Sequence, residues 1–138
     1  VPDATKAAPE ARQPPLAPNC PPAGHAHNPA AAGAREHVES LEILLRDPGV
    51  DAVLFITVAT LFLDLAAMAR GMAEVVERLR SEGISKPVLP AVLSGDWTRE
   101  SRGILEKAGI PTFESPERAV RALAALRSYA EFRARRPS

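Results

Sequence analysis

The sequence has little of what defines several large classes of protein. Cys20 is its only cysteine, so the chain cannot form an internal disulfide and is not a disulfide-stapled secreted scaffold. Aromatic residues make up 4%, too few for the stacking platforms that bind single-stranded nucleic acid. Lys and Arg total 17, as do Asp and Glu, and this zero net charge excludes a strongly basic nucleic-acid-binding chain.

Long apolar segments are also lacking. The longest mostly apolar run, from Ala52 to Leu63, is too short for a membrane-spanning helix and ends at Asp64. The start of the chain has no basic and apolar leader. These features predict a protein without a membrane segment in the reducing cytoplasm. Because the first residue is Val1 rather than Met, we expect the chain to be a segment of a larger protein.

What is present is typical of one globular domain with an unusual start. The chain has 138 residues, of which 46% are apolar and 25% are charged. Eight of its 14 prolines occur at or before Pro29, and each proline lacks the N–H that a helix needs. We therefore predict a Pro/Ala-rich linker over residues 1–26 and a single domain over residues 27–138.

From Gly33 onward, segments with helical spacing of apolar residues alternate with strand-like segments. The predicted helices cover residues 34–46, 64–82, 100–108 and 115–133, and the predicted strands cover residues 50–58, 87–93 and 110–113. The strand at 50–58 is nearly continuously apolar, which is typical of a strand covered on both faces. The alternation predicts an α/β fold, a flavodoxin-like three-layer parallel sheet with helices on both faces.

An additional edge strand at 27–32 would complete this sheet. Without it, an open edge would favour a homodimer formed by strand pairing. Ligands of such sheets bind at the carboxyl ends of the strands, where the loops 57–60, 94–98 and 113–116 are expected. Ser94, Gly95 and Asp96 are candidate contacts to a phosphate or nucleotide, although capping of the next helix by Asp96 or Thr98 is the favoured alternative.

Several motifs occur in a fixed order along the chain. They are Asn28-Pro29, Asp47-Pro48-Gly49-Val50-Asp51-Ala52-Val53, Lys86-Pro87-Val88-Leu89, Lys107-Ala108-Gly109-Ile110-Pro111 and Ser115-Pro116-Glu117. In this order the chain resembles the flavodoxin-like third domain of NDP-forming (ADP-forming) acyl-CoA synthetases. It is also similar to the carboxyl-terminal domain of the succinyl-CoA synthetase β subunit. The resemblance extends from about Pro14 to Tyr129.

The resemblance implies one part of an acid–CoA ligase. The complete enzyme would use CoA, ATP or ADP and Mg²⁺, and it would pass through a phosphohistidine. The CoA-binding, phosphohistidine and ATP-grasp domains would be the partners of this chain, which itself would hold no cofactor, no metal and no catalytic residue and would be inactive alone. Its role would be to hold the phosphohistidine loop at a helix N-terminus, and the residues that match this position are Val58, Ala59 and Thr60.

Two departures from the family pattern favour an alternative. The acid that usually follows the first Asn-Pro is absent after Asn28-Pro29, and Leu61 and Phe62 occur in the loop where glycines are frequent. Glycine allows the closest approach of backbone to phosphate. The alternative is a non-catalytic interaction or regulatory module that keeps the fold.

Three further features have ordinary interpretations. His25 and His27 could form a metal site with His37, or one of them could be a phosphohistidine. Plain loop histidines are the favoured interpretation, since no acid or cysteine completes a set of metal ligands. Cys20 has no neighbour that would activate its thiol. The last helix and its end are rich in arginine, which favours a solvated face, with a docking surface for an acidic partner as the alternative. These arginines are Arg118, Arg121, Arg127, Arg133, Arg135 and Arg136.

Overall fold

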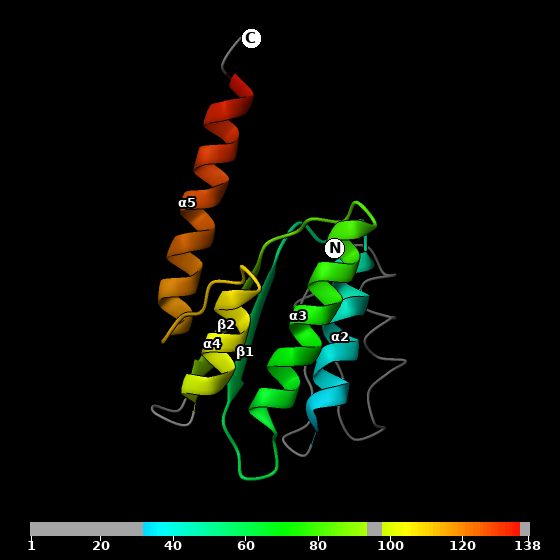
Figure 1. The fold of residues 1–138 in the computed structure, drawn as a ribbon. Coiled ribbons are helices and arrows are strands. Elements are labelled where there is room, and N and C mark those ends of the chain that lie inside the picture. The colour runs from blue at the N-terminus through cyan, green and yellow to red at the C-terminus, as the bar shows by residue number, and fades with distance from the viewer. Residues whose placement is uncertain (1–31, 94–97, 136–138) are drawn as a thin grey trace.

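The computed structural model describes residues 32–93 and 98–135. Along the chain the elements are α2 (Ala34–Arg46), β1 (Val53–Val58), α3 (Leu65–Ser81), β2 (Val88–Leu93), α4 (Arg99–Lys107) and α5 (Pro116–Arg135). In Figure 1, α2, α3 and α4 run alongside one another, whereas much of α5 extends past the end of the sheet at which β1 begins.

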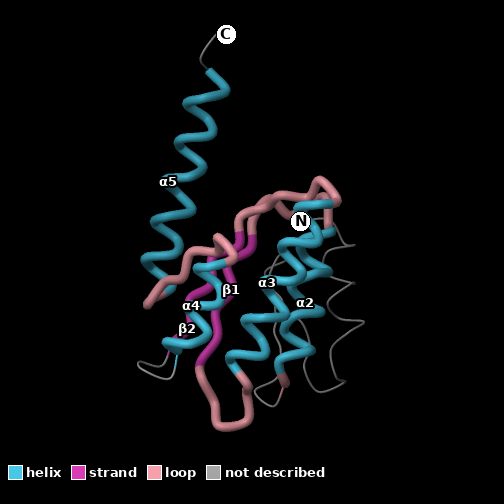
Figure 2. The backbone as a smooth tube through the Cα atoms, viewed as in Figure 1, coloured by secondary structure: helices cyan, strands magenta, loops and turns pink. Residues whose placement is uncertain are grey.

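The two strands form a parallel pair. Val53 pairs with Val88 and Val58 with Leu93, so the carboxyl ends of both strands lie together. Phe113 adds one isolated parallel bridge to Ala91 on the far side of β2. Since parallel strands need a crossover, α3 connects β1 to β2 as Figure 2 shows. This arrangement confirms the predicted α/β fold with a parallel sheet.

One face of the sheet is covered by α2, α3 and α4. Side chains alternate along a strand, and Val53 of β1 joins Val88 and Val92 of β2 in the core beneath these helices. The central helix is α3, which contacts both α2 and α4. Its inward side chains have less than a tenth of their surface exposed, and they are Leu65, Met68, Ala69, Met72, Val75, Val76 and Leu79.

The opposite face is covered by the start of α5. No residue of α5 belongs to the core beneath α2–α4, yet α5 contacts both strands. On this face Leu89, Ala91 and Ala119 are buried. Ile56 and Val58 of β1 are 51% and 54% exposed there, so the prediction that this strand is covered on both faces was wrong at its carboxyl end. None of the described helices has the length and apolar content that crossing a membrane requires.

The helix ends follow the signals in the sequence. Gly83 and Gly109, just after α3 and α4, adopt positive φ angles of 86° and 72°, a conformation that a side chain disfavours. At the start of α5, the Arg118 amide donates to Ser115 Oγ over 3.4 Å. The predicted helix stops and the predicted Ser115-Pro116 start are therefore confirmed.

The third predicted strand, 110–113, is reduced to the bridge at Phe113. Its amide donates to the Pro90 carbonyl over 2.9 Å. Extending this parallel ladder toward the start of both strands would need N–H groups from Pro90 and Pro111, which prolines lack. The predicted edge strand at 27–32 falls almost entirely outside the described residues, as does the linker at 1–26, so the domain boundary stays a prediction.

Candidate functional site

The segment between β1 and α3 lies at the carboxyl end of the sheet, where ligands of parallel sheets bind. Val58 is the last residue of β1, and the Ala59 amide donates to the Leu93 carbonyl over 3.1 Å. The Leu63 amide then donates to the Thr60 carbonyl over 3.2 Å, which closes a turn. The predicted residues Val58, Ala59 and Thr60 therefore occupy the end of β1 and the start of this turn.

These residues do not form the first turn of the following helix. The N-cap of α3 is Asp64, whose Oδ1 accepts a hydrogen bond from the Ala67 amide over 2.8 Å. Leu61, Phe62 and Leu63 separate Thr60 from this cap. A carboxylate thus already occupies the positive end of the α3 dipole, which weakens the attraction of that end for a second anion. Asp as a preferred N-cap was the signal in the sequence that separates the turn from the helix.

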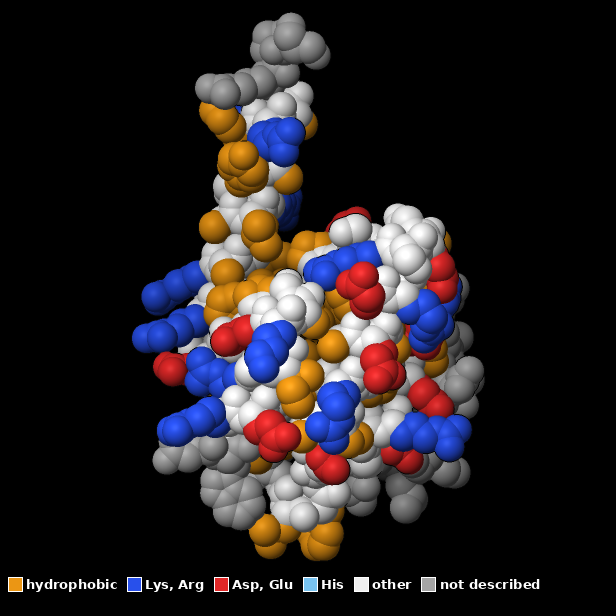
Figure 3. Space-filling model, in the orientation of Figure 1, with side chains coloured by type: hydrophobic (Ala, Val, Ile, Leu, Met, Phe, Trp, Pro, Cys, Tyr) orange, Lys and Arg blue, Asp and Glu red, His pale blue; other side chains and the backbone are white. Residues whose placement is uncertain are grey.

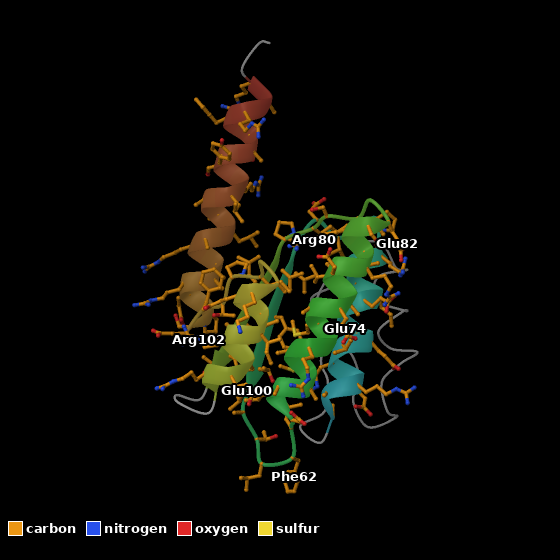
Figure 4. All side chains as sticks on the ribbon, in the orientation of Figure 1. Phe62, Glu74, Arg80, Glu82, Glu100 and Arg102 are labelled. Carbon is orange, nitrogen blue, oxygen red and sulfur yellow. The ribbon has the colours of Figure 1, made fainter. Side chains whose placement is uncertain are left out.

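The turn presents backbone donors and apolar side chains together. Within the described residues, the amides of Thr60, Leu61 and Phe62 donate to no protein acceptor. The side chains of Leu61 and Phe62 are 83% and 87% exposed, and Figure 4 shows Phe62 directed away from the domain. Leu63, by contrast, is buried and anchors the turn to the core.

The other candidate loop, Ser94-Gly95-Asp96, lies outside the described residues, so its contacts stay a prediction. The residues that flank it are well placed at the same edge. Leu93 ends β2 beside Val58, and Thr98 precedes α4 with only 2% of its surface exposed. Ser101 Oγ donates to the Thr98 carbonyl over 2.8 Å, which stabilises the start of α4.

Among the residues that the structure describes, no group of three His, Cys, Asp or Glu side chains is placed to bind a metal ion. His37 serves packing: its Nδ1 lies 2.7 Å from the Gly33 carbonyl oxygen, and its ring meets Phe55 edge-on at 5.9 Å between centroids. His25, His27 and Cys20 fall outside the described residues.

The strongest charge cluster lies at the other end of the sheet, where α2 and α3 finish. Arg46 Nη1 is 2.7 Å from Glu82 Oε2, and Arg78 Nη2 is 2.8 Å from Glu42 Oε2. Arg46 also reaches Glu42 at 2.9 Å. The hydrogen bond from Arg78 lowers the pKa of the Glu42 carboxyl, and that from Arg46 lowers the pKa of Glu82. The cluster links two helices and lies far from the β1–α3 turn.

Comparison with known proteins identifies the family. The model of the Ligase-CoA domain matches residues 9–136, nearly the whole chain. This chain belongs to the Ligase-CoA domain family. The family includes the acid–CoA ligases that the motifs around Asp47 and Lys107 resemble, so the resemblance drawn from the sequence is confirmed.

The relatives of this Ligase-CoA domain are parts of larger enzymes. It is 32% identical over 112 residues to the α subunit of acetate–CoA ligase (ADP-forming) II of Pyrococcus furiosus, covering 77% of this chain and 24% of that subunit. The α subunit of the acetate–CoA ligase (ADP-forming) I of the same organism is 32% identical over 120 residues, and this match covers 83% of the present chain and 25% of that subunit. The chain thus spans about a quarter of these relatives.

A solved structure has the same fold. It is the dinucleotide-forming acetyl-coenzyme A synthetase 1 of Ca. Korarchaeum cryptofilum, determined in complex with phosphate and ADP. The TM-score is 0.79 at 25% sequence identity, and the match covers 96% of this chain and 27% of that one. The Ligase-CoA domain described above therefore has the fold of one part of a synthetase.

Proposed function

We propose that this chain is the domain of an ADP-forming acid–CoA ligase that holds the phosphohistidine loop of another domain against its β1–α3 turn. Family membership and the quarter of its relatives that the chain spans support a place in a larger synthetase. CoA, ATP or ADP and Mg²⁺ would then bind mainly to the CoA-binding, phosphohistidine and ATP-grasp domains of a cytoplasmic enzyme. The isolated chain would have no ligase activity.

The observation that carries this proposal is the set of unpaired amides at the carboxyl end of the sheet. Thr60, Leu61 and Phe62 are three exposed residues in succession, and their backbone N–H groups have no acceptor among the described residues. Successive amides in a turn form a concave site that favours anions. A phosphorylated side chain supplies several strong acceptor oxygens for such donors. Val58 and Ala59 would fix the position of the turn, because the Ala59 amide is bonded to β2.

Phosphate titration followed by ¹H–¹⁵N NMR tests the proposal on the 138-residue chain. We expect saturable amide shifts at residues 58–62, with sodium chloride at matched ionic strength as the control. Asp64→Asn keeps a good N-cap but removes the nearby negative charge, so phosphate affinity should increase about twofold to fivefold. Asp51→Asn removes an exposed carboxylate at the other end of β1 and should leave the affinity unchanged. Shifts that are absent, or that chloride reproduces, would overturn the phosphate role.

A second function is favoured by the apolar tip of the same turn. The exposed side chains of Leu61 and Phe62 are costly in water and are typical of a protein-binding surface. In this second function the chain is a non-catalytic interaction or regulatory module. The pair Leu61→Gly and Phe62→Gly distinguishes the two functions. It should leave phosphate shifts in place or strengthen them if the amides hold the anion, whereas the loss of a protein complex alone would favour the module.

A further inference from the structure

The helix α5 has an apolar side of which the domain covers only the first part. Leu123, Leu126 and Tyr129, called here the α5 stripe, recur every three residues and so lie along one ridge of the helix. Before them Ala119 is fully buried on the sheet, and Leu123 is half-buried. Leu126 and Tyr129 are 49% and 60% exposed. Figure 1 shows that this second half of α5 projects past the sheet.

The projecting half of α5 has apolar side chains on its surface. Figure 3 shows apolar side chains along it, separated from the apolar tip of the β1–α3 turn by the whole length of the domain. Most described helices bury one side in the core, whereas Ala119 is the only residue of α5 that is fully buried. A ridge that begins in the core and continues into solvent favours a docking surface over a solvated helix.

The charges around the α5 stripe indicate what covers it. The helix contains five arginines and two glutamates. Arg127 is paired with Glu131 at 2.9 Å, but Arg133 has no ion pair with any described residue. Arg133 follows Leu126 by seven residues and Tyr129 by four, so it lies on the same side of α5 as the stripe. A second copy of α5 would bring like charges together, which costs affinity. An occupant edged by carboxylates would instead pair with Arg133.

The length of the relatives indicates where such an occupant lies. The chain spans about a quarter of the P. furiosus α subunits, so a complete relative has a large surface outside the part seen here. We propose that the second half of α5 docks through the α5 stripe into an apolar groove, edged by Asp and Glu, on another domain of the same synthetase. This proposal depends on the proposed place of the chain in a synthetase, but not on the phosphate role of the β1–α3 turn.

Hydrogen–deuterium exchange tests the docking in the complete native synthetase and in the 138-residue chain. We expect amides of residues 124–133 to exchange at least about tenfold more slowly in the complete synthetase. Leu126→Asp and Tyr129→Asp should remove this protection, because each places a charge in an apolar groove. Ser128→Asp lies on the opposite side of α5 and is the matched control, which should keep the protection.

The possible outcomes distinguish this docking from dimerisation through α5, from the proposed place in a synthetase and from the phosphate role of the β1–α3 turn. Equal exchange in both proteins, or equal loss in the Ser128→Asp control, would overturn the docking. Sedimentation of the 138-residue chain as a dimer that Tyr129→Asp dissociates would make a second copy the occupant and overturn it as well. A native protein whose mass leaves no room for further domains would contradict the place in a synthetase itself. Protection of α5 without phosphate shifts at the turn would contradict only the phosphate role.

Discussion

The contact between α2 and α3 allows a test in which two glycine-to-alanine substitutions have opposite signs. Gly71 lies in the middle of α3, and a Cβ atom added there would be 2.7 Å from Val38 Cγ2 of α2. Gly103 lies in the middle of α4, where a Cβ would meet no atom within 4 Å. Both substitutions remove the same backbone entropy from the unfolded chain, so any difference between them comes from packing.

The magnitudes follow from the two sites. Gly103→Ala should raise the free energy of unfolding by about 0.5–1 kcal/mol, the usual gain for alanine over glycine inside a helix. At Gly71 the same gain is opposed by overpacking of about 1–3 kcal/mol, because the β-branched Val38 has little rotamer freedom with which to move away. We therefore expect Gly71→Ala to lower the free energy of unfolding, by as much as about 2 kcal/mol.

Urea unfolding followed by circular dichroism measures both changes, provided that the dependence of the free energy of unfolding on urea concentration is the same in each variant. The double variant Val38→Ala and Gly71→Ala provides the control, since removing the valine methyl groups makes room for the new Cβ. The change in its free energy of unfolding should be more favourable, by about 1–3 kcal/mol, than the sum of the changes in the two single variants. Equal stabilisation by Gly71→Ala and Gly103→Ala, or strict additivity with Val38→Ala, would refute the close approach of α2 to α3.

Three further measurements probe the core, the α3 cap and the charge cluster. The Met72 side chain is completely buried, so Met72→Ala should lower the free energy of unfolding by about 2–5 kcal/mol and Met72→Leu by less than about 1.5 kcal/mol. Equal urea midpoints for the two variants would contradict the burial of this side chain. Asp64→Ala should cost about 0.5–2 kcal/mol in the same assay and Asp64→Asn only a few tenths. The lowered pKa values of Glu42 and Glu82 mean that their stabilisation is complete above the ordinary carboxyl pKa and is lost as the pH falls through the lowered values. Between about pH 5 and pH 3, the double variant Glu42→Gln and Glu82→Gln should therefore lose less stability than the wild type, and parallel losses would contradict the pairing.

The helices could be predicted from the sequence because local signals determine where they begin and end. Gly83, Gly109 and Ser115 each mark a boundary through backbone preference or a capping hydroxyl, and the structure places the boundaries within a few residues of those signals. The third strand was overpredicted because composition does not show which backbone groups face a neighbour. Pro90 and Pro111 fall where N–H groups would be needed, which depends on the register of β2 with β1.

The position of the candidate residues in the fold could be predicted, but their backbone contacts could not. Fold topology predicts that ligands bind at the carboxyl end of β1, and the family resemblance implied Val58, Ala59 and Thr60 as the residues there. The structure places these three residues at that edge, and their role stays a prediction. Which atoms face solvent depends on the turn itself. The Ala59 amide is bonded to β2, whereas the amides of Leu61 and Phe62, outside the predicted set, have no acceptor in the part of the protein that the structure describes. Sequence spacing does not contain this information, because it depends on how the turn closes through Thr60.

The exposed apolar residues together indicate that surface outside the described residues completes this domain. Ile56 and Val58 belong to a strand with the apolar composition of one buried on both faces, yet about half of each is exposed. Phe62 lies at one end of the domain (Figure 4), and the half of α5 that contains Tyr129 projects past the other end (Figure 1), so a single small partner cannot cover both. In the synthetase proposed above, neighbouring domains would contact this domain at both ends, in keeping with the quarter of its relatives that the chain spans. The phosphate titration and the exchange experiment examine these two ends separately, and each result bears on one contact without depending on the other.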